Sequence, residues 1–213
     1  MILHWKLHQR LQSQLLWSVE WLTASGVSTL NLTQTEGDLA LSSASDYYPI
    51  FNAENVTLKN TGGKVKLENT STGELTDSNL TIEAAGDISL KSAKGITGKS
   101  NAQVSLTSTN GDVTIEQTAN LVMQDGKLTI RALAGAISIS TNATVPMFMA
   151  ELDIKAKNDV TLKQNGTTDS SLTWGGAGGS IESTDGNITI EQKSSTYVIS
   201  TLNAVSLNAG GTV

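Results

Sequence analysis

The residues of this chain that could do acid–base chemistry are carboxylates, because there is no cysteine and the only histidines are His4 and His8. Thiolate chemistry, disulfides and cysteine-based zinc sites are therefore excluded, and so is a histidine-based site in the body of the chain. A glycoside hydrolase or polysaccharide lyase would need carboxylates gathered on one surface. We expect six carboxylates to point outward from strands: Glu68, Glu83, Glu116, Asp153, Glu182 and Glu191.

These six acids are not repeated along the chain in the way a catalytic cluster requires. The position of Glu83 is occupied by Thr107 in the next repeat and by Arg131 in the one after it. We therefore interpret the acids as solvating groups and predict that the protein is not an enzyme. We predict no catalytic, cofactor-binding or metal-binding residues.

Aspartates recur at a second position of the repeat, just before a predicted strand, where we find Asp38, Asp87, Asp112 and Asp159. Stacked carboxylates could bind Ca²⁺. However, Lys64, Ala136 and Asn187 occupy the same position elsewhere, and the glycine-rich nonapeptide of calcium β-rolls is missing. We predict that these aspartates cap turns.

The elements that must carry these side chains are short strands in a regular repeat. Apolar–polar–apolar triplets begin at Val56, Leu80, Val104, Leu128 and Leu152, which are equally spaced along the chain. A second series begins at Leu39, Val65, Ile88, Val113, Ile137, Val160 and Ile188. A weaker third series holds Leu75, Ile96, Leu121 to Met123, Val145 and Val198.

Alternation with a period of two marks strands with one buried face, and a fixed long repeat marks a solenoid. We predict an all-β, right-handed parallel β-helix of about 24 residues per coil over residues 27–213. Turn residues such as Gly86-Asp87 separate the strands. The glycine-rich stretch 175–179 is predicted to be a loop. The main alternative, an antiparallel sandwich, gives no reason for so constant a spacing between equivalent strands.

Residues 1–26 differ from the rest. Leucine and valine recur every three or four residues from Leu3 to Leu22, and Trp5, Trp17 and Trp21 lie among them. This spacing predicts an amphipathic helix that caps the end of the solenoid. A non-native start of the chain and a membrane-surface helix remain alternatives.

The bulk composition excludes two classes of partner. A net charge of −6 and an isoelectric point near 4.9 would repel a phosphate backbone, so we expect no nucleic-acid binding. No apolar run is long enough for a membrane-spanning helix, and polar residues interrupt any signal-peptide core at the N-terminus.

Two surface patterns have simpler explanations. Outward Thr57, Thr81, Ser105 and Thr129 would suit an ice-binding plane, but the neighbouring Lys59, Glu83 and Arg131 are charged. Glycosylation sequons begin at seven asparagines, which we attribute mainly to asparagine in turns followed by threonine in strands. They are Asn31, Asn55, Asn69, Asn79, Asn142, Asn165 and Asn187.

The segments 86–92, 101–106 and 111–115 resemble the repeats of filamentous haemagglutinin-like proteins, which are two-partner-secretion adhesins and contact-dependent toxin carriers. The resemblance extends over about residues 27–213. It implies a secreted, cell-surface stalk of a Gram-negative bacterium, exported through an outer-membrane pore. The chain lacks the Asn-Pro-Asn motifs of the family's secretion domain, since its two prolines are Pro49 and Pro146. We expect a fragment of a longer stalk.

From these observations we expect a non-enzymatic structural or adhesive stalk that presents binding regions to a host or neighbouring-cell surface. The alternative is a cytoplasmic β-helical filament protein similar to bactofilins, whose coil ends stack on one another.

Overall fold

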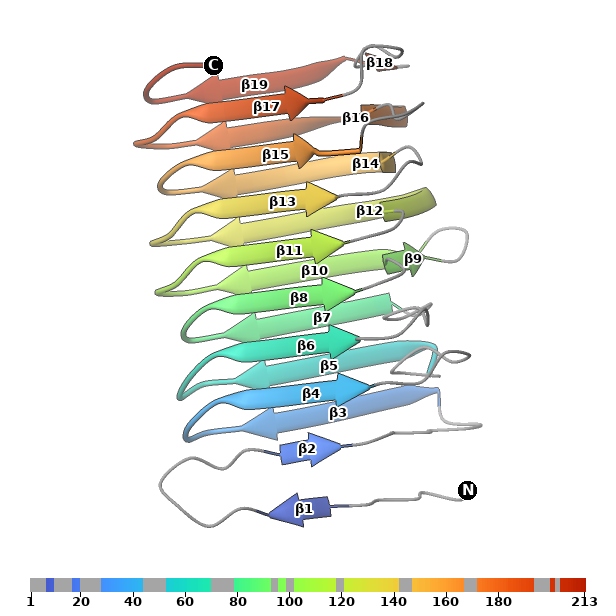
Figure 1. Ribbon diagram of the computed structural model, residues 1–213, viewed down its shortest axis with the longest axis vertical. Helices are drawn as coiled ribbons and strands as arrows, with labels where there is room; N and C mark the ends of the chain where they lie inside the picture. Colours follow the sequence, from blue (N-terminus) through green and yellow to red (C-terminus); the bar gives the residue numbers. More distant parts are fainter. Residues whose placement is uncertain are drawn as a thin grey trace.

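The computed structural model of the chain is a stack of short parallel strands (Figure 1). It describes residues 7–9, 17–19, 28–43, 53–69, 79–92, 96–98, 102–117, 121–141, 147–166, 172–193, 200–201 and 204–213. Within these residues every regular element is a strand. The strands form two large parallel sheets, so the predicted parallel β-solenoid is confirmed.

The first sheet runs along the whole solenoid. Its strands, in spatial order, are β18 (Ser200–Thr201), β16 (Leu172–Ser183), β14 (Met147–Ala156), β12 (Leu121–Ala132), β10 (Gln103–Ser108), β7 (Asn79–Ala84), β5 (Asn55–Asn60) and β3 (Thr29–Gln34). Two further strands join this sheet at its sides, β9 (Ile96–Gly98) beside β12 and β19 (Val205–Ala209) beside β16.

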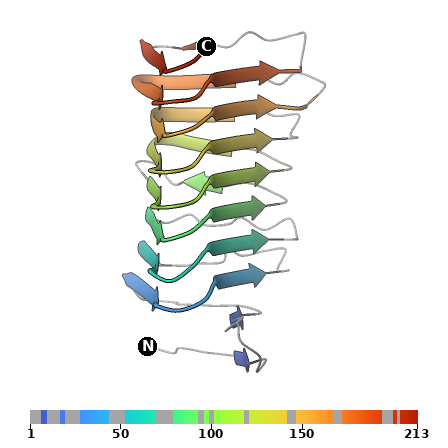
Figure 2. The same cartoon turned by 90° about the vertical axis from the view of Figure 1, so that its left-hand side faces the viewer.

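The second sheet is visible as a row of stacked arrows in Figure 2. It consists of β17 (Ile188–Gln192), β15 (Val160–Gln164), β13 (Ile137–Thr141), β11 (Val113–Gln117), β8 (Ile88–Ser92), β6 (Val65–Asn69) and β4 (Leu39–Ser43). A tight turn joins a first-sheet strand to the following second-sheet strand in seven places: β3 to β4, β5 to β6, β7 to β8, β10 to β11, β12 to β13, β14 to β15 and β16 to β17. One coil therefore comprises one strand of each sheet and their connections.

The inward columns form in the predicted register. Val56 pairs with Leu80, Leu80 with Val104, Val104 with Leu128, and Leu128 with Leu152. The second series stacks in the same way from Leu39 to Ile188. These side chains are almost completely buried. Burying one such aliphatic side chain contributes roughly 1.5–3 kcal/mol, so the stacked columns account for the stability of strands too short to exist alone.

The third predicted strand series is only partly separate from the first series. β9 contains Ile96 and pairs with Leu121–Met123, which is the beginning of the long strand β12. In β12, β14 and β16 the third strand thus continues directly into the first strand of the following coil. Leu75, Val145 and Val198 lie outside the described residues.

The sequence predicts a loop at the glycine-rich stretch 175–179. In the structure this stretch is part of the strand β16. Met149 pairs with Trp174 and Glu151 pairs with Gly178. The chain therefore advances two residues on β14 but four residues on β16 between these two pairs. The extra residues form a bulge in the strand. Gly178 has a φ of 84° there, which a residue without a Cβ adopts at low cost.

The predicted N-terminal helical cap is not shown. Of residues 1–26 the structure describes only β1 (Leu7–Gln9) and β2 (Trp17–Val19), which pair as antiparallel strands. The prediction of helix is therefore wrong for these six residues, and the rest of the segment lies outside the described residues. Among the described strands, β3 and β4 stand at one end of their sheets, and β2 lies next to β4. Trp17 and Val19 of β2 are of residue types that favour strands, which agrees with the extended structure of this described piece.

Candidate functional site

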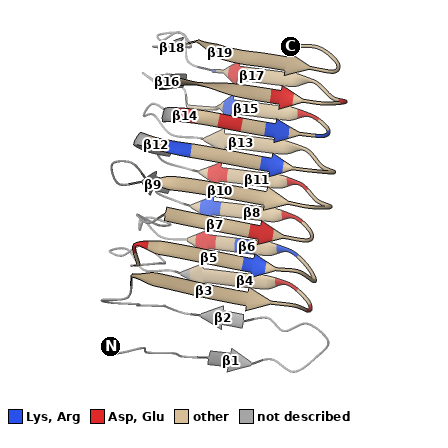
Figure 3. Cartoon of the chain, turned by 180° about the vertical axis from the view of Figure 1, so that it is seen from behind, with Lys and Arg blue, Asp and Glu red and all other residues tan. Residues whose placement is uncertain are grey.

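The outward carboxylates are the first candidates for chemistry, and each of the six predicted from the sequence lies beside a cation. The pairs are Glu68–Lys66, Glu83–Lys59, Glu116–Lys91, Asp153–Arg131, Glu182–Lys155 and Glu191–Lys163. Except for Glu68–Lys66, each pair joins two adjacent coils. The acids do stay scattered, as expected, but they are paired rather than merely solvated. Figure 3 shows blue and red positions adjoining one another along the outer face.

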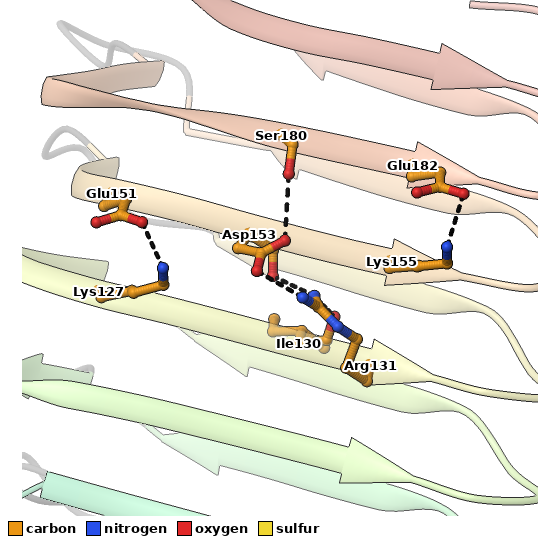
Figure 4. Close-up of polar contacts among 8 residues, drawn as sticks. All are labelled: Lys127, Ile130, Arg131, Glu151, Asp153, Lys155, Ser180 and Glu182. Atoms are coloured by element: carbon orange, nitrogen blue, oxygen red, sulfur yellow. Dashed lines mark hydrogen bonds and ion pairs between the residues drawn. The ribbon is translucent and has the colours of Figure 1, made fainter.

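A group of neighbouring charges lies on β12, β14 and β16 (Figure 4). Arg131 donates to the Asp153 carboxylate at 2.5 Å and to the Asp153 backbone carbonyl at 2.9 Å. Ser180 donates to the other carboxylate oxygen of Asp153 at 3.1 Å. Lys127 and Glu151 approach to 2.5 Å on one side of this group. The Asp153 oxygens therefore bind side chains of both neighbouring coils.

The ionisation of these groups opposes general acid catalysis. The hydrogen bond from Arg131 holds the pKa of the Asp153 carboxyl below its ordinary value. Lys64 lowers the pKa of Asp87, and Lys66 lowers that of Glu68, again mainly through side-chain hydrogen bonds. A general acid working near neutral pH needs a raised pKa. These three carboxylates are instead held ionised by their partners.

The aspartates before the second-sheet strands bind the next coil. Asp38, Asp87, Asp112 and Asp159 each accept a hydrogen bond through Oδ1 from the backbone N–H of the equivalent residue one coil later, at 2.8–3.0 Å. Asn187 does the same for Thr212 at 2.9 Å. We call these five residues the capping row. The predicted capping role is confirmed, with the difference that each side chain caps the following turn rather than its own.

No metal centre is seen in the described part of the chain. It contains no group of three or more histidine, cysteine, aspartate or glutamate side chains that could hold an ion. In the capping row, Oδ1 is engaged with a backbone N–H, and Lys64 places its ammonium 2.7 Å from Asp87 Oδ2. At Asp87 both carboxylate oxygens are therefore engaged by protein groups.

The sequon asparagines on the first sheet also make contacts between coils. Asn79 donates to Asn55 Oδ1 at 3.0 Å and accepts from the Gln103 backbone N–H at 2.9 Å. Both asparagines are exposed. The hydroxyl column of Thr57, Thr81, Ser105 and Thr129 is in register as expected, and its neighbouring column holds Lys59, Glu83, Thr107 and Arg131.

A buried polar column escaped the sequence reasoning. At the ends of the second-sheet strands Asn69, Ser92, Gln117, Thr141 and Gln164 stack inside the solenoid, each at most 3% exposed. The signal was present, because each of these residues follows an inward aliphatic residue by two positions. Sequence reasoning misses this column when it places polar residues outside because of their residue type. The two-residue alternation along each strand places them inside.

Among the residues that the structure describes, no helix has the length and apolar character needed to span a bilayer. In comparisons with known proteins, the family model described as toastrack DUF4097 matches residues 18–191, which is most of the chain. No curated protein and no solved structure matches the chain.

Proposed function

We propose that the chain, which belongs to the toastrack DUF4097 family and is a β-solenoid repeat protein, works without catalysis. In this proposal it is a stalk that extends and presents binding regions. The pairing of its outward charges carries this proposal. Each outward carboxylate named above lies within 4.0 Å of a cation, five of the six across coils, so these acids face partners within the stack instead of converging on a substrate.

The shape of the solenoid supports a spacing role. Each coil adds about 4.8 Å to the length, and the same inward columns continue from coil to coil. A rod of this kind can be lengthened by repeating one unit, without a new core. Its outer faces carry threonine, serine and paired charges, which suit many weak contacts acting together.

The resemblance of the repeat to filamentous haemagglutinin-like adhesins supports placing the stalk at the surface of a Gram-negative bacterium. In that setting its partners are glycans or proteins of a host or neighbouring cell, and an outer-membrane pore exports the parent protein. Fractionation of the native cells tests this location. Recovery of the protein in the cytoplasm would contradict it.

The absence of catalysis is tested with the purified chain and pectin, alginate, chondroitin and bacterial wall glycans. We expect no turnover. Turnover that is lost on changing one outward carboxylate, for example Asp153→Asn, would overturn the proposal. Ser105→Ala, which lies on the same sheet and changes no charge, is the matched control.

Adhesion is tested by coating beads with the chain at increasing density and measuring their retention on cell surfaces. We expect retention to rise more steeply than density, because weak contacts gain from multivalency. Beads coated with heat-unfolded chain are the control. Pelleting of the free chain as filaments, with no density-dependent retention, would contradict the stalk and favour the bactofilin-like alternative.

A further inference from the structure

Two turns between the sheets contain dipeptides that are chemically fragile. The chain has four Asn-Gly or Asp-Gly dipeptides, at residues 110–111, 125–126, 165–166 and 185–186. In such dipeptides the backbone nitrogen of glycine can attack the side-chain carbonyl carbon of the preceding residue. The first and the last of the four occupy the same place in their coils, immediately before the capping-row position, and both Asn110 and Asp185 are exposed.

The attacking nitrogen is held in the same way in both turns. Gly111 N–H donates to Ser108 Oγ at 3.0 Å, and Ser108 Oγ donates to the carbonyl of Gly86, one coil earlier, at 2.8 Å. Gly186 N–H donates to Ser183 Oγ at 3.1 Å, and Ser183 Oγ donates to the carbonyl of Asn158 at 2.7 Å. Both serines are almost completely buried.

Other coils lack this serine, and they also lack the fragile dipeptide. The column that contains Ser108 and Ser183 holds Gln34 and Asn60 in the first two coils, where the residues before the turn glycine are Glu36 and Gly62. Asn60 Oδ1 accepts from Gly63 N–H at 3.0 Å there. In the other coils the column holds alanine, at Ala84, Ala132, Ala156 and at Ala209, which precedes Gly210-Gly211. The corresponding residues before the turn glycine are Ala85 and Ala134, and in the coil of Ala156 the glycine itself is replaced by Asn158. In the coil of Ala84, Gly86 N–H donates directly to the Gly63 carbonyl at 2.9 Å. The serine is thus present where the residue before glycine is Asn or Asp.

From this coincidence we propose that Ser108 and Ser183 are positioning residues that protect Asn110-Gly111 and Asp185-Gly186 from succinimide formation. At Asn110 the reaction would form a bond between Gly111 N and the side-chain carbonyl carbon and break the bond from that carbon to the amide nitrogen. The glycine proton would leave with the amide as ammonia. At Asp185 the protonated carboxyl group would lose its hydroxyl, which would leave with the proton of Gly186 N–H as water. Solvent water would then open the ring to aspartate or isoaspartate. A nitrogen whose N–H is donated to a fixed hydroxyl is held away from that attack.

The packing of the turns explains why such protection matters. A Cβ built on Gly111 would lie 2.2 Å from Asp87 Oδ1 and 2.5 Å from Asp87 N, so there is no room for an added carbon on this residue. An isoaspartate at position 110 would insert an extra methylene beside this contact. It would also displace Asp112 N–H from Asp87 Oδ1, which it reaches at 3.0 Å. Damage at one turn would therefore open a contact between coils.

The test uses the full chain, folded, at slightly basic pH for Asn110 and at mildly acidic pH, where part of the carboxyl group is protonated, for Asp185. Peptide mapping by mass spectrometry measures ammonia loss at Asn110, and chromatographic separation of isoaspartyl peptides measures isomerisation at Asp185. We expect Ser108→Ala to speed the reaction at Asn110 about fivefold, the factor for losing one ordinary hydrogen bond. Ser183→Ala should speed only Asp185. Alanine is the native residue of this column in other coils, so both variants are compatible with the fold.

The four dipeptides control for one another. If either variant speeds all four equally, the cause is general destabilisation and the proposal is overturned. It is also overturned if the rate at Asn110 is unchanged in Ser108→Ala, as would follow if Gly111 N–H closed directly onto the Gly86 carbonyl. A reconstruction gives an independent check. Ala134→Asn places asparagine before Gly135 in a coil without the serine and should deamidate faster than Asn110, and adding Ala132→Ser should slow it.

Discussion

The carboxylate of Asp112 accepts a hydrogen bond at 2.8 Å from the backbone N–H of Ala136, which lies one coil further along the chain. The backbone carbonyl of Ala136 in turn accepts from the N–H of Val113 at 2.9 Å. The two coils are therefore joined at this turn by both backbone groups of one residue. The same pattern holds where Asp87 binds Asp112.

This relationship predicts the effect of removing the cap. Asp112→Ala leaves the Ala136 N–H without its acceptor and should lower the free energy of unfolding by about 1 kcal/mol. Asp112→Asn should retain most of the stability, because Asn187 fills the same role natively through its own Oδ1. Urea unfolding of the three proteins measures the difference. Equal stability of the alanine variant and the parent would show that the cap contributes nothing.

The alternation of inward and outward residues predicts opposite results for two neighbours on β11. Ile115 is completely buried between Leu90 and Ile139, so Ile115→Asp should cost several kcal/mol by placing an unpaired charge in an apolar column. Thr114 faces outward between two serines, and Thr114→Asp should cost well under about 1 kcal/mol. Thermal melting of both variants provides the test, and equal melting temperatures would contradict the assignment.

The close approach of the turns predicts that equivalent glycines tolerate a methyl group differently. At Gly111 a Cβ would come within 2.2 Å of Asp87 Oδ1 and 2.5 Å of Asp87 N, and the backbone nitrogen cannot move away cheaply. Gly111→Ala should therefore destabilise the fold by about 1–3 kcal/mol. At Gly86 the nearest atom is Lys64 Cγ at 3.2 Å, on a flexible side chain. Gly86→Ala is the matched control and should cost less; the reverse order in chemical denaturation would refute the packing argument.

The sequence predicts the inward columns correctly because the buried residues obey two simple rules, a period of two within a strand and a constant step between coils. Val56 and Leu80 can be paired from these rules alone. The partner of Glu83 could have been found in the same way, since Lys59 lies one full repeat earlier in the same column. The diagonal contact of Arg131 with Asp153 could not, because it depends on how far one side chain leans across the sheet. The N-terminal helix was predicted from local spacing, which carries no information about the neighbouring sheet edge.

The charged pairs predict how stability depends on pH. Asp87 and Asp153 have folded-state pKa values below the ordinary value of 3.8, because Lys64 and Arg131 donate hydrogen bonds to their ionised forms. A lowered pKa means that the unfolded chain takes up protons first as the pH falls. Their contribution to stability is therefore complete above about pH 4 to 5 and is lost as the pH falls further through the folded-state values. The free energy of unfolding, measured by urea titration from neutral to acidic pH, should decline in this range.

Asp153→Asn should make that decline shallower, since one carboxylate with a lowered pKa has been removed. Ser105→Ala lies on the same sheet, changes no charge and should leave the slope unaltered. Because the pairs are partly exposed, raising the salt concentration should reduce the contribution of the Arg131–Asp153 pair at neutral pH. A slope unchanged by Asp153→Asn would mean that Asp153 has the same proton affinity in the folded and unfolded chains. The hydrogen bonds from Arg131 and Ser180 would then not favour its ionised form.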